Sequence, residues 1–114
     1  MSKLNKLETQ VRLSISNPKS ETSSVFGRGI ATLCLGVREK GSLNAAAKGI
    51  GMAYSKAWRI IKETENALGV DLLIRDGAHG SELTPEGDML LDTYFVIEEK
   101  ISQEALELYK KLTK

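Results

Sequence analysis

Residues 42–69, "SLNAAAKGIGMAYSKAWRIIKETENALG", decide the fold of this chain, because two helical patterns abut here around the tight turn "GIGM". The first pattern begins after Ser42, whose hydroxyl suits a helix N-cap, and its three consecutive alanines let a neighbouring helix cross closely. The second pattern runs from about Ala53 to Leu68, and Gly69 ends it. The stretch therefore predicts a helix–turn–helix.

The segments on either side of this stretch have patterns of their own. Upstream, apolar and polar residues alternate over residues 10–16, which is the period of a half-buried strand. An amphipathic helix follows, with its apolar stripe on Ile30, Leu33, Cys34 and Val37. Downstream, "DLLIR" and "ELT" flank a turn and predict a β-hairpin. Pro85 then opens a helix that is expected to reach about Leu112, with Thr84 as its cap.

This order of elements is that of a winged helix-turn-helix, a mainly α fold with a small β wing and here a long C-terminal helix. In that arrangement the second helix of the pair enters the major groove of DNA. A chain of 114 residues is expected to form a single domain. Within it, residues 1–84 would form the DNA-binding part, and residues 85–114 would form a dimerisation helix.

The helix predicted for residues 53–68 has two chemically different sides. At about 100° per residue, its inner side is mostly apolar and carries Ala57, Ile61, Thr64 and Leu68. Its outer side carries Ser55, Arg59, Lys62 and Asn66, with Glu63 and Glu65 off this face. Such side chains bind phosphates and base edges. Trp58 lies between the two sides, where packing at the core edge is favoured over direct contact with DNA.

The charges of the chain are divided along its length. Residues 1–75 hold 12 Lys and Arg against 6 Asp and Glu, a balance of +6, whereas residues 76–114 hold 4 against 9, a balance of −5. A basic first part is typical of a segment that faces a polyanion. From the charges alone, chance placement of charged residues on solvated faces remains an open alternative.

The C-terminal helix combines an acidic surface with an apolar seam. The seam residues are spaced three and four apart, and they are Leu91, Tyr94, Ile97, Ile101, Ala105, Leu108 and Leu112. An acidic helix with such a seam suits subunit pairing better than DNA binding. The alternative is that the helix folds back on its own domain. A two-fold dimer would set two DNA-binding helices about one DNA turn apart, roughly 34 Å.

The run "GSLNAAAKGIGMAYSKAWRIIKETENALGVDLL" resembles the winged DNA-binding domain of the molybdate-responsive (ModE-like) repressors. The matching positions are Gly41, Ser42, Leu43, Ala46, Ala47, Gly51, Met52, Tyr54, Ala57 and Trp58, and later Leu83, Thr84 and Gly87. LysR-type regulators have a related winged domain, and "ALGVDLLIR" is similar to their helix end and first wing strand. The resemblance covers roughly residues 8–112.

The resemblance implies a homodimeric bacterial transcription regulator that binds double-stranded DNA. The cytoplasm is the expected location, because the single cysteine fits a reducing compartment and the sequence shows no signal segment. The candidate DNA-contacting residues are Ser42, Tyr54, Ser55, Lys56, Arg59, Lys62, Arg75 and His79. The seam residues Leu91, Tyr94, Ile97, Ile101, Ala105 and Leu108 would pair the subunits. Because the full-length repressors carry additional molybdate-binding domains and this chain ends at Lys114, molybdate sensing is not expected of it. No cofactor is expected, and the sequence identifies no small-molecule effector.

Other classes of function find less support in the sequence. One His and one Cys are too few for a Cys/His metal site, and no nucleophile–base pair or carboxylate dyad points to an enzyme. Cys34 is expected to be a buried, inert thiol. The chain has neither an apolar signal segment nor a run long enough to span a membrane. The main alternative is a protein-interaction module, such as an antirepressor that pairs with a full-length relative.

Overall fold

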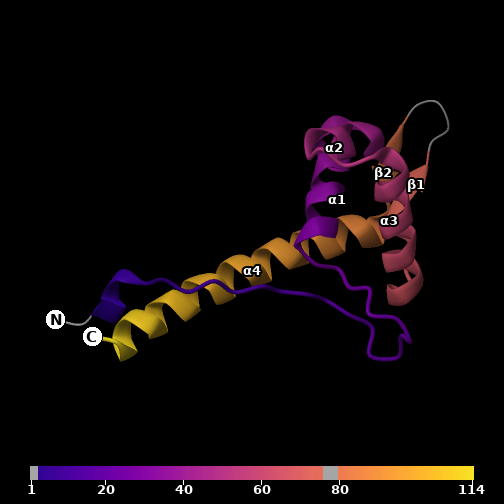
Figure 1. The fold of residues 1–114 in the computed structure, drawn as a ribbon. Coiled ribbons are helices and arrows are strands. Elements are labelled where there is room, and N and C mark those ends of the chain that lie inside the picture. Colours follow the sequence, from indigo (N-terminus) through magenta and orange to yellow (C-terminus); the bar gives the residue numbers. More distant parts are fainter. Residues whose placement is uncertain (1–2, 76–79) are drawn as a thin grey trace.

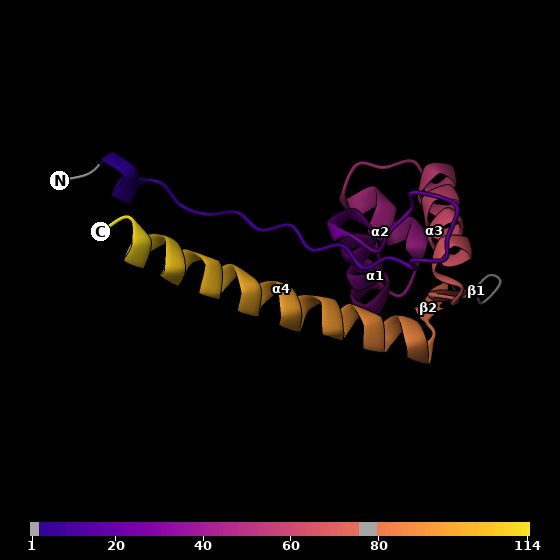
Figure 2. The same ribbon diagram turned by 90° about the horizontal axis from the view of Figure 1, so that it is seen from below.

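The computed structural model describes residues 3–75 and 80–114. Their elements, in chain order, are η1 (Lys3–Lys6), α1 (Arg28–Lys40), α2 (Leu43–Gly49), α3 (Tyr54–Leu68), β1 (Leu73–Arg75), β2 (Ser81–Leu83) and α4 (Pro85–Leu112). The helices α1 to α3 and the hairpin form a globular unit, and α4 extends away from it (Figures 1 and 2). The described part of the chain is therefore elongated, with extents of 60 × 32 × 22 Å.

The predicted helix–turn–helix is confirmed as α2 and α3. The hydroxyl of Ser42 accepts a hydrogen bond from the backbone N–H of Ala45 at 3.0 Å and so caps α2. The helix α1 crosses α2 closely, because a Cβ atom at Gly36 would lie only 2.6 Å from the Cβ of Ala46. In the turn before α3, Gly51 has a φ of 69°, a conformation that favours glycine.

The predicted hairpin and C-terminal helix are confirmed as well. The strands β1 and β2 pair antiparallel, with Leu73 opposite Leu83. This hairpin is called the wing below. The hydroxyl of Thr84 accepts from the backbone N–H of Gly87 at 2.9 Å, and Pro85 occupies the first turn of α4. The cap and the proline fix where α4 begins, directly after the second strand of the wing.

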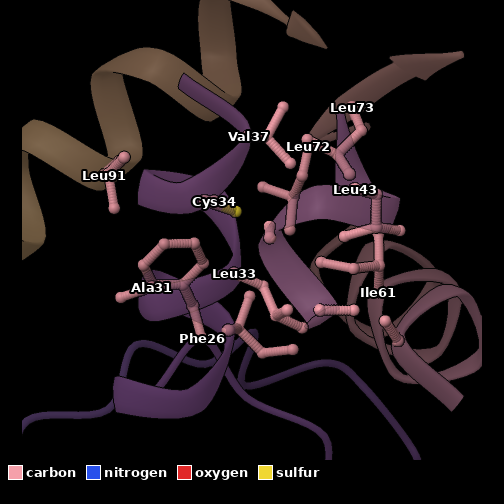
Figure 3. Close-up of a cluster of buried hydrophobic side chains, with 14 of the residues drawn as sticks. Phe26, Ala31, Leu33, Cys34, Val37, Leu43, Ile61, Leu72, Leu73 and Leu91 are labelled. Carbon is pink, nitrogen blue, oxygen red and sulfur yellow. The ribbon is translucent and has the colours of Figure 1, made fainter. Parts of the chain in front are cut away.

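The core lies where α1, α2, α3, the wing and the first turns of α4 meet (Figure 3). It includes Leu33 and Cys34 of α1, Leu43 of α2, Ile61 of α3 and Leu91 of α4, all of them fully buried. Phe26, just before α1, packs edge-on against Tyr94 of α4 with ring centroids 5.5 Å apart. Burial of these side chains from α1, α2, α3, the wing and α4 supplies the main driving force that holds α3 and the wing in fixed positions.

Ion pairs on the surface add to the contact between α1 and α4. Arg38 of α1 pairs with Asp88 and Asp92 of α4, and Arg28 pairs with Glu98 at 3.0 Å. The Tyr94 hydroxyl donates to the same Glu98 carboxylate at 3.0 Å. Because these pairs span three turns of α4, they restrict the direction in which the helix leaves the globular unit.

The strand predicted for residues 10–16 is wrong apart from a single bridge. Only Ile15 pairs, through two hydrogen bonds with Phe26 of 2.8 and 2.9 Å. Residues 8–14 instead run extended beside α4, as both Figure 1 and Figure 2 show, and η1 reaches the C-terminal end of that helix. There the Tyr109 hydroxyl donates to the Leu4 carbonyl at 2.7 Å. Alternation with a period of two shows only which side chains are buried. Here they are buried against a helix and not within a sheet.

Candidate nucleic-acid interface

The outer side of α3 is open to solvent, as its sequence predicts. Ser55, Arg59, Lys62 and Asn66 are exposed, whereas Ala57, Ile61 and Thr64 on the opposite side are buried. The separation arises because the apolar side must cover the core, which leaves the polar side unobstructed. A long, basic and exposed helix face is the shape that fits a major groove.

A groove of about 500 Å³ separates this face of α3 from the wing. Ser55, Trp58, Arg59 and Lys62 line it from α3, and Leu73 and Arg75 line it from β1. Five of these six side chains are polar, cationic or aromatic, which are groups that contact phosphates, bases and sugars. The wing therefore adds one cation, Arg75, to the cations of α3.

Trp58 organises the cations around this groove. The Lys62 ammonium lies 5.3 Å from the centre of the indole ring, and the Arg75 guanidinium lies 5.5 Å from it. Arg75 also lies 6.0 Å from the ring of Tyr54, whose hydroxyl accepts a hydrogen bond from the indole N–H. Both aromatic rings thus attract a cation from the wing toward α3. Trp58 is half-buried, and it packs at the edge of the core, as the sequence indicated.

A second hollow, of about 370 Å³, adjoins the groove and shares Arg75 and the wing with it. Its lining includes Ser42 and Asn44 at the start of α2 and Tyr54 at the start of α3. The structure therefore brings together most of the predicted contact residues, namely Ser42, Tyr54, Ser55, Arg59, Lys62 and Arg75. Lys56 is exposed in the first turn of α3 but lines neither hollow. His79 lies outside the described residues.

Two carboxylates lie closer to the cations of α3 than the helical spacing of the sequence suggested. Glu63 pairs with Arg59 at 2.9 Å, and both side chains are about half exposed or more. Glu65 lies 3.2 Å from the Lys62 ammonium. The expectation that both glutamates lie off the outer face is therefore wrong for Glu63, whereas Glu65 is buried and lies off that face as expected. For Glu63 the i,i+4 spacing from Arg59 was the signal in the sequence.

The structural role of Glu65 was not predicted from the sequence. Its side chain is buried, and its Oε2 accepts hydrogen bonds from the backbone N–H groups of Leu72 and Leu73 at 2.7 and 3.1 Å. These bonds connect the last turns of α3 to the beginning of β1. A carboxylate on the core flank of an amphipathic helix was the available signal, because such a group needs buried donors.

The residues predicted to pair subunits fall into two groups. Leu91 and Tyr94 are buried in the core of their own chain, with exposed fractions of 0% and 1%, so their place in an open seam is corrected. This part of α4 follows the alternative in which the helix packs on its own domain. Farther along, Ile97 and Leu108 are 38% and 50% exposed, and Ile101 and Ala105 are partly buried. For these four residues subunit pairing stays a prediction.

Cys34 is buried in the core, as expected. Burial raises the pKa of its thiol to about 12, and the nearby charge of Glu65 acts in the same direction. Within residues 3–75 and 80–114, no three His, Cys, Asp or Glu side chains gather in a way that could hold a metal ion. In the same part of the chain, no helix is both long and apolar enough to cross a membrane.

Comparisons with known proteins place this geometry in a family. None of the curated proteins compared with the chain matches it. Solved structures do match it, among them two with a TM-score of 0.56 each. The CbnR_DBD–DNA complex is 31% identical and covers 65% of this chain and 84% of that one. The BenM_DBD/benA site 1 DNA complex is 24% identical and covers 72% of this chain and 90% of that one. A family model matches residues 32–88, which run from α1 through α2, α3 and the wing to the first turn of α4. The chain belongs to the bacterial regulatory helix-turn-helix proteins of the lysR family, a regulatory and not an enzymatic class.

Proposed function

We propose that this chain is a sequence-specific regulator of transcription that binds double-stranded DNA as a homodimer in the bacterial cytoplasm. The observation that carries the proposal is the exposed face of α3, which bears Ser55, Arg59 and Lys62 beside the Arg75-bearing wing. The CbnR_DBD structure, which is 31% identical to this chain, is a complex with DNA, and this supports the same ligand for this chain.

In this proposal each group of residues has a distinct role. Arg59 lies in the middle of the outer face of α3 and reads a base edge, because its planar fork matches the acceptors of guanine. Ser55, Lys56 and Lys62 bind phosphates, and the N-terminal end of α3 adds its own affinity for anions. Ser42 and Tyr54 contact the backbone beside the shared hollow, and Arg75, with His79 of the wing turn, binds the flanking backbone.

The homodimer is supported by the part of α4 that leaves the globular unit. Ile97 and Leu108 expose apolar surface there, and Ile101 and Ala105 lie between them along the helix. A sustained apolar seam on a protruding helix is stabilised by a second helix. A two-fold dimer would double the number of phosphate contacts, and it would bind a pseudo-palindromic site.

Within the family, we propose the closer kinship to the molybdate-responsive repressors that residues 41–58 indicate. The support is the retained run from Gly41 to Trp58, whose Ser42 caps α2 and whose Tyr54 and Trp58 face the wing. Molybdate sensing forms no part of this proposal.

Selection from a randomised duplex pool at about 0.15 M salt tests the function, since physiological salt suppresses nonspecific phosphate binding. We expect the protein to retain a pseudo-palindrome with half-sites about 10 base pairs apart. Retained DNA without a motif would contradict sequence specificity, and a protein that retains no DNA would contradict the proposal as a whole.

Sedimentation of the Ile101→Lys variant tests the dimer separately. A lysine in the seam would place like charges against each other at low dielectric, so the variant should sediment as a monomer. An unchanged dimer would move the interface away from this part of α4. Exposed Lys100, substituted as Lys100→Ala, is the matched control and should leave the dimer intact.

A further inference from the structure

The N-terminal arm, defined here as residues 8–14, is an extended segment whose backbone forms no hydrogen bond with any described residue. It begins after η1 and ends at the Ile15–Phe26 bridge. Backbone N–H and C=O groups that lack partners form the edge of a strand, and such an edge favours pairing with another chain.

The side chains of the arm alternate in the manner of one strand of a sheet. Thr9, Val11 and Leu13 are partly buried, and Leu13 packs against the core. The intervening Glu8, Gln10, Arg12 and Ser14 are exposed. The inner side chains therefore hold the arm on its own chain, and the backbone edge remains open to a second strand.

We propose that the arms of two copies pair as an antiparallel two-stranded ribbon with Gln10 opposite Gln10, an inference that rests on the proposed homodimer. In this register Glu8 of each copy lies opposite Arg12 of the other, so that the pairing forms two ion pairs across the ribbon. Neither Glu8 nor Arg12 forms an ion pair within the described part of its own chain.

The charges select this register over its neighbours. A ribbon centred on Arg12 would set two arginines opposite each other, and one centred on Glu8 would set two glutamates opposite each other. A ribbon centred on Val11 would leave both charged residues opposite uncharged ones. A register shifted by one residue in only one strand would turn the outer face of one arm toward the inner face of the other.

The position of the arm agrees with the seam on α4. A small hollow of about 150 Å³ is lined by residues 9–12 of the arm, by Arg28 and by Ser102 of α4. Gln10 therefore lies beside the turn of α4 that contains Ile101, in the middle of the exposed seam from Ile97 to Leu108. A single two-fold axis near Gln10 can serve both the ribbon and the helix pair.

Disulfide formation in the full chain tests the register. In the Gln10→Cys variant the two new thiols would face each other across the axis, within the Cα separation of less than about 7 Å that a disulfide needs. Mild oxidation should give a covalent dimer. The control Ser14→Cys would hold its thiols eight residues out of register, roughly 27 Å apart, and should stay unlinked. The unsubstituted protein, whose Cys34 is buried, should also stay unlinked.

The outcomes separate the arm from the homodimer. A sedimenting dimer whose Gln10→Cys form does not link, or whose Ser14→Cys form links equally fast, would overturn the arm pairing and leave the homodimer standing. An unsubstituted protein that is monomeric both free and on DNA would overturn the homodimer and the ribbon with it.

Charge reversal provides an independent measurement. Glu8→Arg should raise the dimer dissociation constant about tenfold, because both cross-strand pairs become repulsive. The double variant Glu8→Arg/Arg12→Glu should restore the original constant, since it exchanges the partners without changing the register. If the two substitutions weaken the dimer additively in the double variant, the proposed pairing of Glu8 with Arg12 is wrong.

Discussion

The guanidinium of Arg75, the last residue of β1, lies 5.5 Å from the centre of the ring of Trp58 in the second turn of α3. Lys62, one turn farther along α3, lies 5.3 Å from the same ring. One indole therefore holds a cation from the wing and a cation from the proposed DNA-reading helix on the same side of the molecule. Attraction to the ring offsets part of the repulsion between the two positive charges.

Replacing the indole should weaken DNA binding without removing a charge. We expect Trp58→Leu to lower the affinity for a selected duplex about fivefold, because Arg75 loses the ring that positions it. Fluorescence anisotropy with a labelled duplex measures the change. Trp58→Phe, which keeps an aromatic face, should lose less, and equal losses in the two variants would assign the effect to packing.

Arg59 is expected to determine sequence preference. Arg59→Ala should cost about 1–3 kcal/mol of binding free energy for the selected site and relax the preference at one base position. Lys62→Ala is the comparison. Loss of a phosphate contact should reduce the slope of log affinity against log salt concentration by about one and leave the sequence preference unchanged. Binding that is unchanged in Arg59→Ala would exclude this residue from the interface.

Glu63 should reduce the affinity for DNA, because its carboxylate pairs with Arg59 at 2.9 Å on the face proposed to meet a polyanion. Exposed ion pairs contribute little stability, so Glu63→Gln should fold normally. We expect this variant to bind duplexes several-fold more tightly, by about 0.5–1 kcal/mol. In an Arg59→Ala background most of the gain should vanish, and a gain that persists there would assign the effect to general charge.

Glu65 should contribute mainly to the stability of the fold and less to the affinity for DNA. Glu65→Ala leaves the backbone N–H groups of Leu72 and Leu73 without their buried acceptor, at a cost of about 1–3 kcal/mol in the free energy of unfolding. Urea denaturation followed by circular dichroism measures this cost. Glu65→Gln retains one acceptor oxygen and should lose less. Equal stability of Glu65→Ala and the unsubstituted protein would contradict the role in attaching α3 to β1.

The thiol of Cys34 should make stability depend on alkaline pH. Its pKa in the folded chain is raised to about 12 from an ordinary value of 9.0, so the unfolded state loses its proton first as the pH rises. The contribution is therefore fully present below about pH 9 and falls by up to about 1.4 kcal/mol per pH unit above it. Between pH 8 and pH 10, the free energy of unfolding measured with urea should fall more in the unsubstituted protein than in Cys34→Ala. An equal loss of stability with pH in the unsubstituted protein and in Cys34→Ala would contradict the raised pKa of Cys34.

Local signals in the sequence were sufficient for α2, α3 and α4 and their ends, whereas η1 and the start of α1 were not predicted. Ser42, Thr84 and Pro85 mark where α2 and α4 begin, since a cap or a fixed φ acts on its immediate neighbours. The apolar stripe of α3 correctly predicted which side is buried, because one helix period relates all the residues involved. The same periodicity exposed Arg59 and Lys62 on the outer side.

Contacts between residues that are distant in the sequence could not be predicted from such local signals. The alternation of residues 10–16 was correct in its burial pattern, but the surface that buries them includes a helix almost ninety residues later. The seam of α4 likewise had the correct spacing, yet Leu91 and Tyr94 serve the core of their own chain. A periodic pattern identifies a face that must be covered and contains no information about what covers it.

The sequence by itself determined the helix–turn–helix, the wing, the extent of α4 and the basic face of α3, because each depends on short-range backbone and burial rules. Only the tertiary structure brought Arg75 to Trp58, paired Glu65 with the start of β1, and laid the arm along α4. Those relationships arise when separate elements pack on one core, and their geometry is set by shape and burial across the whole fold.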